Sequence, residues 1–257
     1  MLHHEVAGQG PAVALLHSTV CDSRMWDREF AALAERCQVL RYDFRGYGSS
    51  PLPPEDWSNV EDLRALLDEV GIERAALVGL SGGAFVAVDF ALVHPERIRG
   101  LVLAAPTFGG LDWSEDVRRF GEEEDKLLDA GDLEGAVELN LRMWVDGPRR
   151  PPDAVDPAVR AKVGEMQRRA FEVQLAAEPG RLQRLEPPAA ERLADVAAPT
   201  LVLVGDADHA DVVERAELLA ARIPGARQVV LPGVAHMINL ERPEEFLRLV
   251  VDFLDSP

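Results

Sequence analysis

Apolar and polar positions divide the first hundred residues into alternating short runs and longer periodic segments. Continuous apolar runs of strand length, rich in Val, Leu and Ala, lie at 11–17, 38–43, 74–80 and 98–106. Apolar residues recur at helical spacing in 24–37, 59–71 and 82–94. Buried strands that alternate with helices predict a mostly parallel sheet covered by helices on both faces.

This alternation stops after residue 106 and resumes near residue 196. Between these points we find no convincing strand pattern, and helical periodicity is clearest at 132–145 and 157–177. Strands are expected again at 198–205 and 227–233, with helices at 211–222 and 243–254. The pattern therefore predicts an α/β core formed by residues 1–106 and 196–257, and a helical cap inserted as residues 107–195.

Composition narrows the class of protein. The chain has 257 residues, of which 47% are hydrophobic, so it can bury a sizeable core. Its 27 basic and 45 acidic residues give a net charge of −18, which argues against nucleic-acid binding and against an acidic membrane surface. We see no signal peptide and no bilayer-spanning run, so we expect a cytoplasmic protein whose Cys21 and Cys37 are free thiols.

The stretch ALVGLSGGAFVAVDFAL, residues 76–92, places one serine among glycines between two buried segments. Gly79 to Gly83 fits the pattern G-x-S-x-G, and Ser81 falls between a predicted strand and a predicted helix. Glycines permit the sharp turn that such a junction requires, and the turn exposes the serine oxygen near a helix N-terminus. The pentapeptide alone is a weak signal, but its place in the chain favours a nucleophilic serine.

A nucleophilic serine needs a base, and the base needs an acid that orients it. His236 follows the last predicted strand, whereas His3 and His4 are expected in a frayed N-terminus. The acid candidates are the aspartates after the preceding strand, Asp206, Asp208 and Asp211. The order Ser, Asp, His along the chain is the order of one hydrolase architecture and not of the other serine-hydrolase folds.

Four motifs now carry a resemblance: LLHSTVCDSRMW, RYDFRGYGSS, VGLSGGAFVAVDFALVHPERIRGLVLAAP, and LVLVGDADHADV with LPGVAHMINLERPEEF. Together they resemble the α/β-hydrolase fold superfamily, and most of all its small serine carboxylesterases and the 3-oxoadipate enol-lactonase-like group. The resemblance implies Ser81 as nucleophile and His236 as base. It places the acid at the end of a Gly-x-x-Asp element, which is Asp208 here, with Asp206 as the alternative.

The resemblance also implies an oxyanion hole made by backbone N–H groups of Gly82 and Thr19. Here the chain departs from the family, which commonly has His-Gly-x where this sequence has His17-Ser18-Thr19. Serine is strained at a positive φ, so the geometry of this loop depends on whether position 18 adopts one. We interpret His17 as structural, and Asp43, in the D-x-R-G-x-G turn, as scaffolding near the site.

The activity expected is hydrolysis of a small, mainly apolar carboxylic ester through an acyl-enzyme. A lactonase or a carbon–carbon bond hydrolase would use the same triad, and a ligand receptor on this fold is the alternative from another class. No metal, nucleotide or flavin motif is visible, so we expect no cofactor. Serine at position 81 excludes the dehalogenases and epoxide hydrolases of this fold, which use an aspartate nucleophile.

Substrate choice is expected to depend on the cap. Candidate pocket residues are Trp26, Met143, Trp144, Met166 and Phe171. Because the net charge is strongly negative and these side chains are apolar, we predict a neutral ester or lactone as the better substrate. Three arginines could overturn this prediction by binding an anionic group, although a solvated surface position is favoured for each of them: Arg142, Arg149 and Arg150.

Overall fold

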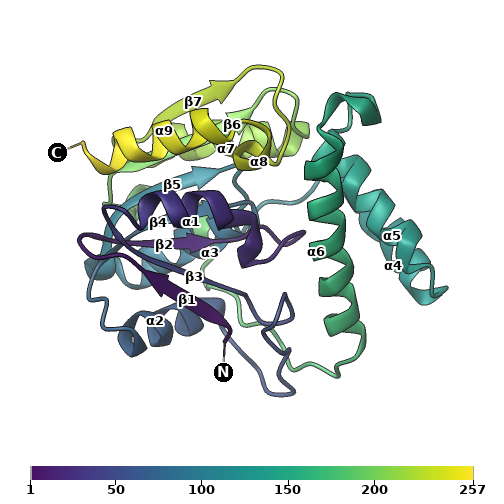
Figure 1. Ribbon diagram of the computed structural model, residues 1–257, viewed down its shortest axis with the longest axis horizontal. Coiled ribbons are helices and arrows are strands. Elements are labelled where there is room, and N and C mark those ends of the chain that lie inside the picture. Colours follow the sequence, from purple (N-terminus) through teal and green to yellow (C-terminus); the bar gives the residue numbers. More distant parts are fainter. Residues whose placement is uncertain (1, 257) are drawn as a thin grey trace.

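The computed structural model describes residues 2–256, and its centre is a seven-stranded sheet (Figure 1). The strand order is β1-β3-β2-β4-β5-β6-β7, and every neighbouring pair is parallel except β1 with β3. The strands are β1 His4–Ala7, β2 Ala12–Leu16, β3 Gln38–Tyr42, β4 Ala75–Leu80, β5 Ile98–Ala104, β6 Thr200–Gly205 and β7 Arg227–Leu231. All residues of β2, β4 and β6 are buried, as continuous apolar runs in a covered parallel sheet should be.

Helices cover both faces of the sheet. The helix α1 (Asp27–Leu33) and α9 (Pro243–Leu254) lie together at the front in Figure 1, and α8 (Ile238–Glu241) precedes α9. The other core helices are α2 Asn59–Glu69, α3 Gly82–Val93 and α7 Ala210–Arg222. These elements confirm the predicted α/β class. Within residues 2–256, every helix is too short or too polar to cross a bilayer.

The first strand was not expected from the sequence. His4 pairs with Tyr42 across an antiparallel ladder, and the backbone N–H of His3 donates to Ser50 Oγ at 2.9 Å. The expectation that this end is frayed is therefore wrong. A run of four residues is too short to show a strand pattern in the sequence. These residues form a strand because they pair with the edge of β3, which is distant in the sequence.

The first helix is also shorter than expected. A 3₁₀ turn over Ser23–Trp26 precedes α1, and the carboxylate of Asp22 accepts the backbone N–H of Arg24 at its start. The α-helix itself ends at Leu33, four residues before the expected end at residue 37. Two hydrogen bonds to Leu33 O, from Arg36 and Cys37, close the chain into a tighter turn there.

Between β5 and β6 the chain forms a block of helices that Figure 1 shows to one side of the sheet, near the ends toward which the parallel strands point. Its main helices are α4 Glu115–Asp129, α5 Leu133–Asn140 and α6 Pro157–Leu175, with a π-helical stretch at Leu141–Asp146. The periodicity did not single out α4. Only Val117 is buried on that helix, so its apolar pattern is sparse.

Candidate active site

Ser81 occupies the turn between β4 and α3. Its backbone has φ 56° and ψ −112°, a left-handed conformation that is costly for a residue with a Cβ. The turn is held because Ser81 N–H donates to Ala104 O at 2.9 Å and Thr107 Oγ1 donates to Ser81 O at 3.1 Å. The serine side chain thus stands at the carboxyl end of the sheet and at the N-terminus of α3.

The neighbouring glycines are required by close backbone contacts. A Cβ on Gly83 would lie 2.0 Å from Leu16 O, and one on Gly79 would lie 2.4 Å from Gly83 O. Either substituent would push α3 away from the sheet, since real Cβ atoms do not approach other atoms so closely. The glycine pattern seen in the sequence therefore has a steric cause: α3 packs directly against β2 and β4.

His236 lies in the loop between β7 and α8 and is 2% exposed. Its Nδ1 lies 2.8 Å from Oδ2 of Asp208, which is itself completely buried. An ionised carboxylate only accepts hydrogen bonds, so Nδ1 carries the proton and Nε2 is left as the basic nitrogen. No hydrogen bond joins His236 to Ser81 in this structure, although both residues line one cavity.

The two neighbouring aspartates point to different partners. Asp208 uses Oδ2 for His236 and Oδ1 for the backbone N–H of His209, at 2.7 Å. Asp206 is exposed, and its Oδ1 accepts the N–H of Gly233 at 2.6 Å. Asp206 therefore braces the loop that leads to His236, whereas Asp208 is the carboxylate that contacts the imidazole.

Thr19 and Gly82 meet where an oxyanion hole was expected. A Cβ on Gly82 would lie 3.5 Å from the backbone nitrogen of Thr19 and 2.4 Å from its Cγ2. Both residues line the cavity beside Ser81. Neither backbone N–H donates to another of the described residues. The site thus presents two adjacent, unoccupied donors next to the serine.

Hydrogen bonds of His17 and Asp43 stabilise the loop region that carries Thr19. Phe44 N–H donates to His17 Nε2 at 2.9 Å, so Nδ1 holds the proton and donates to Ser18 O at 2.8 Å. Burial lowers the pKa of His17, which keeps this neutral form. Ser18 does not have a positive φ; the described non-glycine residues that do are Ser81 and Ala105. Serine in place of the family's glycine therefore carries no backbone strain.

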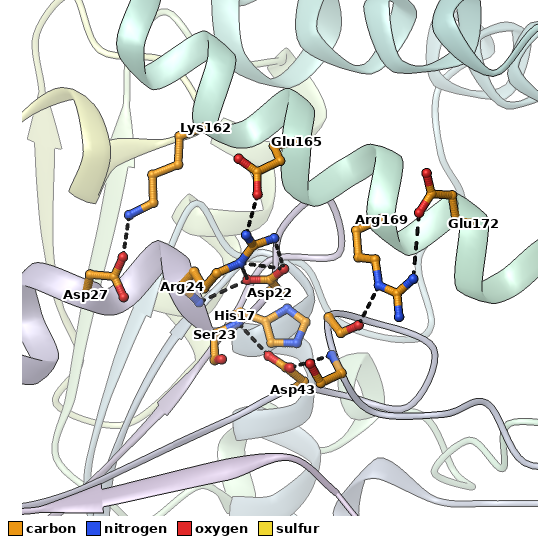
Figure 2. Close-up of polar contacts among 12 residues, drawn as sticks. His17, Asp22, Ser23, Arg24, Asp27, Asp43, Lys162, Glu165, Arg169 and Glu172 are labelled. Carbon is orange, nitrogen blue, oxygen red and sulfur yellow. Dashed lines mark hydrogen bonds and ion pairs between the residues drawn. The ribbon is translucent and has the colours of Figure 1, made fainter.

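Ion pairs connect this loop region to α6 (Figure 2). Arg24 lies between Asp22, at 2.8 Å, and Glu165 of α6. Lys162 of α6 contacts Asp27 at 2.9 Å. Lower in the same view, the two carboxylate oxygens of Asp43 accept the backbone N–H groups of Ser23 and Ser49, both at 2.8 Å. Ion pairs therefore join α6 of the helical block to the region next to the loop that bears Thr19.

A cavity of about 1060 Å³ opens over Ser81 and His236, between the sheet ends and the helical block. Trp144 forms part of its wall, with its ring centroid 4.9 Å from that of His236. The rest of the wall comes mainly from loops of the core, from α3, α4 and α6, and from the segments 107–113 and 179–189; its larger apolar members include Phe44, Tyr47, Phe85, Phe120 and Phe171. The cavity is large enough for a small organic substrate.

Of the five expected pocket residues, Trp144 and Phe171 line this cavity. Trp26 is fully buried against Phe246, with ring centroids 5.8 Å apart. Met166 is 1% exposed in the core cluster, and Met143 is half-buried outside the cavity wall. Trp26 and Met166 thus belong to the hydrophobic core, which is the usual place of large apolar residues at helical spacing.

The three arginines considered from the sequence lie outside the cavity wall, and each has partners within the protein. Arg142 pairs with Asp146 at 2.6 Å, and Arg150 pairs with Glu241 at 2.7 Å. Arg149 donates to the carbonyl oxygen of Asp208 at 3.2 Å. Arg149 and Arg150 fasten the helical block to loops of the core, whereas the partners of Arg142 lie within the block.

Sequence reasoning missed several residues of the cavity wall, both apolar and polar. Phe85 and Asp89 follow Ser81 at helical spacing on α3, a signal that was available once the helix was predicted. Gln167 of α6 is 4% exposed, and its Oε1 has no hydrogen-bond partner among the described residues. No group of His, Cys, Asp or Glu side chains in residues 2–256 is arranged to hold a metal ion.

Comparisons with known proteins show the family of this chain. The model of the alpha/beta hydrolase family matches residues 13–249. A pimeloyl-[acyl-carrier protein] methyl ester esterase of Aeromonas hydrophila is 29% identical over 96% of both chains. A 2-hydroxy-6-oxononadienedioate/2-hydroxy-6-oxononatrienedioate hydrolase of Paraburkholderia xenovorans is 31% identical, over 98% of this chain and 90% of its own. The crystal structure of the enol-lactonase from Burkholderia xenovorans superposes with a TM-score of 0.78 at 27% identity, covering 99% of this chain and 96% of that one. By its sequence, its sheet and its strained serine turn, this chain belongs to the alpha/beta hydrolase family.

Proposed function

We propose that this chain is a serine hydrolase that cleaves small, neutral, mainly apolar carboxylic esters through an acyl-enzyme on Ser81. The observation that carries the proposal is the arrangement of Ser81 at a strained turn, with Asp208-bound His236 and two free N–H donors lining the same cavity. Nucleophile, base, orienting acid and oxyanion donors are the parts that acyl transfer needs.

In the proposed cycle, His236 Nε2 removes the proton of Ser81 as the serine oxygen attacks the ester carbonyl. Asp208 holds the imidazole in the required tautomer and stabilises its protonated form. The N–H groups of Thr19 and Gly82 bind the developing oxyanion. Hydrogen bonds of this kind often tighten only when substrate is bound, which is consistent with the absence of a Ser81–His236 bond here. His236 passes this proton to the leaving alcohol, which departs and leaves the acyl group on Ser81. Water then attacks the acyl group while His236 removes its proton, and that proton returns to Ser81 as the acid is released.

Residues 107–195 are proposed to act as the cap over this site. The cavity draws walls from α4, the π-helical stretch and α6, all of which fall in that range. The ion pairs of Arg24 with Glu165 and of Lys162 with Asp27 join α6 to the loop region around Thr19. Cap side chains would therefore select the substrate, whereas the core would perform the chemistry.

Lactone hydrolysis is the second candidate, and the likeness to an enol-lactonase structure favours it. A carbon–carbon bond hydrolase would use the same residues, and a relative of that printed function is 31% identical. The three reactions would use the same residues and differ in the bond that is broken at the carbonyl carbon: the C–O bond of an open ester, the ring C–O bond of a lactone, or a C–C bond. A receptor without turnover would instead bind its ligand and release no product.

Turnover of a short-chain nitrophenyl ester tests the proposal. We expect a burst of nitrophenol, an acyl adduct on the peptide that contains Ser81, and single labelling by a fluorophosphonate. Ser81→Ala should abolish all three. Labelling that survives this substitution would refute the assignment of the nucleophile, and binding of esters without turnover would favour the receptor alternative.

A further inference from the structure

Asp89 is a buried carboxyl group that the proposed mechanism does not use. It lies on α3 and is 5% exposed. Its Oδ1 is completely buried and has no hydrogen-bond partner among the described residues. Burial raises the pKa of Asp89 to about 7. An unpartnered buried carboxyl group is costly, so a ligand that supplies the missing partner would be bound favourably there.

The place of Asp89 relative to Ser81 follows from the helix. Ser81 precedes the first residue of α3, and Asp89 lies eight residues after it, with Phe85 midway between them. At 1.5 Å per residue the separation along the axis is roughly 12 Å. Ser81, Phe85 and Asp89 all line the cavity. A substrate whose carbonyl group sits at Ser81 could therefore run along this face of α3 to the carboxyl group.

A smaller chamber of about 240 Å³ adjoins the cavity at this point. We name it the distal chamber; it lies between α2, α3 and the segment 182–186. Phe85, Val86 and Asp89 line both spaces, so Asp89 stands at their junction. The wall opposite α3 is anchored, because Gln183 N–H donates to Trp57 O at 2.7 Å and Leu182 forms a β-bridge with Trp57.

Two other charged residues lie in both walls. The guanidinium of Arg184 is stacked 4.9 Å from the centroid of the Phe85 ring and does not form an ion pair with Asp89. Its charge counteracts part of the effect of burial on the carboxyl group. Glu186 also lines both spaces but is exposed to solvent. Among Asp89, Arg184 and Glu186, Asp89 alone is buried, so the absence of a partner is most costly there.

We propose that Asp89 is a specificity-determining residue that accepts a hydrogen bond from a hydroxyl or ammonium group at the end of the substrate distant from the scissile bond. The proposal rests on the hydrolase activity proposed above and refines it. The apolar segment of the substrate would pack against Phe85 in the cavity near Ser81, and the polar end of the substrate would lie in the distal chamber. A purely alkyl tail would bury Asp89 further without giving it a partner, and should be a poorer substrate.

The test compares nitrophenyl esters of ω-hydroxy, ω-ammonium and unsubstituted straight-chain acids over a series of chain lengths. At the length that reaches Asp89, a donor-bearing ester should exceed its alkyl counterpart in kcat/KM by roughly 10- to 100-fold, as for a hydrogen bond to a charged group. The hydroxyl and ammonium arms show which donor is accepted, since Arg184 opposes an ammonium group and does not oppose a hydroxyl group.

Variants separate this role from a structural one. Asp89→Leu should reduce the donor-to-alkyl ratio to about one, by lowering kcat/KM for the donor-bearing esters and raising it for the alkyl esters, and Asp89→Asn should keep part of the ratio for the hydroxyl series. Glu186→Gln is the matched control, a carboxylate of the same chamber whose loss should leave the ratio unchanged. A ratio near one in the unmodified protein at every length, or an unchanged ratio in Asp89→Leu, would overturn the proposal.

If no ester is turned over, the hydrolase proposal fails but Asp89 can still be examined. Unreactive amides with the same tails are then titrated calorimetrically into the Ser81→Ala protein. Tighter binding of the hydroxyl- or ammonium-bearing amide, lost on adding Asp89→Leu, would support the role of Asp89. Equal binding of all tails would refute it.

Discussion

A methyl group on Gly82 would lie 2.4 Å from Cγ2 of Thr19, and this contact joins the two proposed oxyanion donors. The next atoms of Thr19, its Cβ and backbone nitrogen, would be 3.5 Å away, an ordinary distance. The conflict is therefore confined to one side-chain atom of the loop. It can be relieved by removing that atom.

We predict that Gly82→Ala displaces the Thr19 loop and lowers kcat by about 10²–10³, the usual cost of a lost oxyanion donor. Thr19→Ala alone should have little effect, because the donor is a backbone N–H. The double variant should recover at least about tenfold of the loss. Steady-state kinetics on a nitrophenyl ester would measure this, and a double variant no faster than Gly82→Ala would contradict the placement of the two donors.

The two aspartates after β6 should differ strongly in their effect on catalysis. Asp208→Asn removes the carboxylate that contacts His236 Nδ1 and should lower kcat by roughly 10⁴. Asp206→Asn keeps an oxygen that can accept the Gly233 N–H, so we expect kcat to stay within about threefold and any loss to appear in thermal stability. The opposite ranking in the same assay would reject Asp208 as the acid.

Glu29 should make the stability of the protein depend on pH. It is 1% exposed near Asn239, and neither carboxyl oxygen has a hydrogen-bond partner among the described residues. Burial raises the pKa of Glu29 from 4.5 to about 7. The folded state therefore binds a proton more tightly than the unfolded state, so this contribution to stability is present below pH 4.5 and is lost as the pH rises to about 7.

Glu29→Gln removes this titration. Relative to the unmodified protein, its free energy of unfolding should rise between pH 4.5 and pH 7 by about 3 kcal/mol, at 1.36 kcal/mol for each unit of pKa shift. Urea denaturation of both proteins across this range measures the difference. Glu35→Gln, at an exposed glutamate just after α1, serves as the control. A difference that does not change with pH would show that Glu29 is not a buried acid.

Charge should act against anionic substrates. The net charge is −18, and Arg142, Arg150 and Arg149 are already engaged with Asp146, Glu241 and the Asp208 carbonyl, respectively. We expect a neutral ester to exceed its carboxylate-bearing analogue in kcat/KM by about tenfold at low salt, with a smaller gap at high salt. A preference for the anion that is lost in Arg184→Ala would instead favour the enol-lactonase-like alternative.

The sequence by itself determined the core of the fold and two members of the proposed triad. Apolar runs such as 74–80 and 198–205 identify buried parallel strands, because a strand covered on both faces has no polar side. Ser81 stands out because its turn demands glycines at neighbouring positions. His236 stands out because it follows the last predicted strand. Each of these signals is local, so each can be seen without coordinates.

Tertiary structure decided the roles of residues that depend on where a side chain points or on partners that are distant in the sequence. Asp206 and Asp208 are two residues apart in one turn, and only their contacts with Gly233 and His236 distinguish them. Met143 and Trp144 are adjacent, yet Trp144 alone reaches the cavity, because consecutive residues of a helical turn point in different directions. The strand β1 exists because β3 offers it an edge, and Asp89 is notable because the folded chain leaves it without a partner.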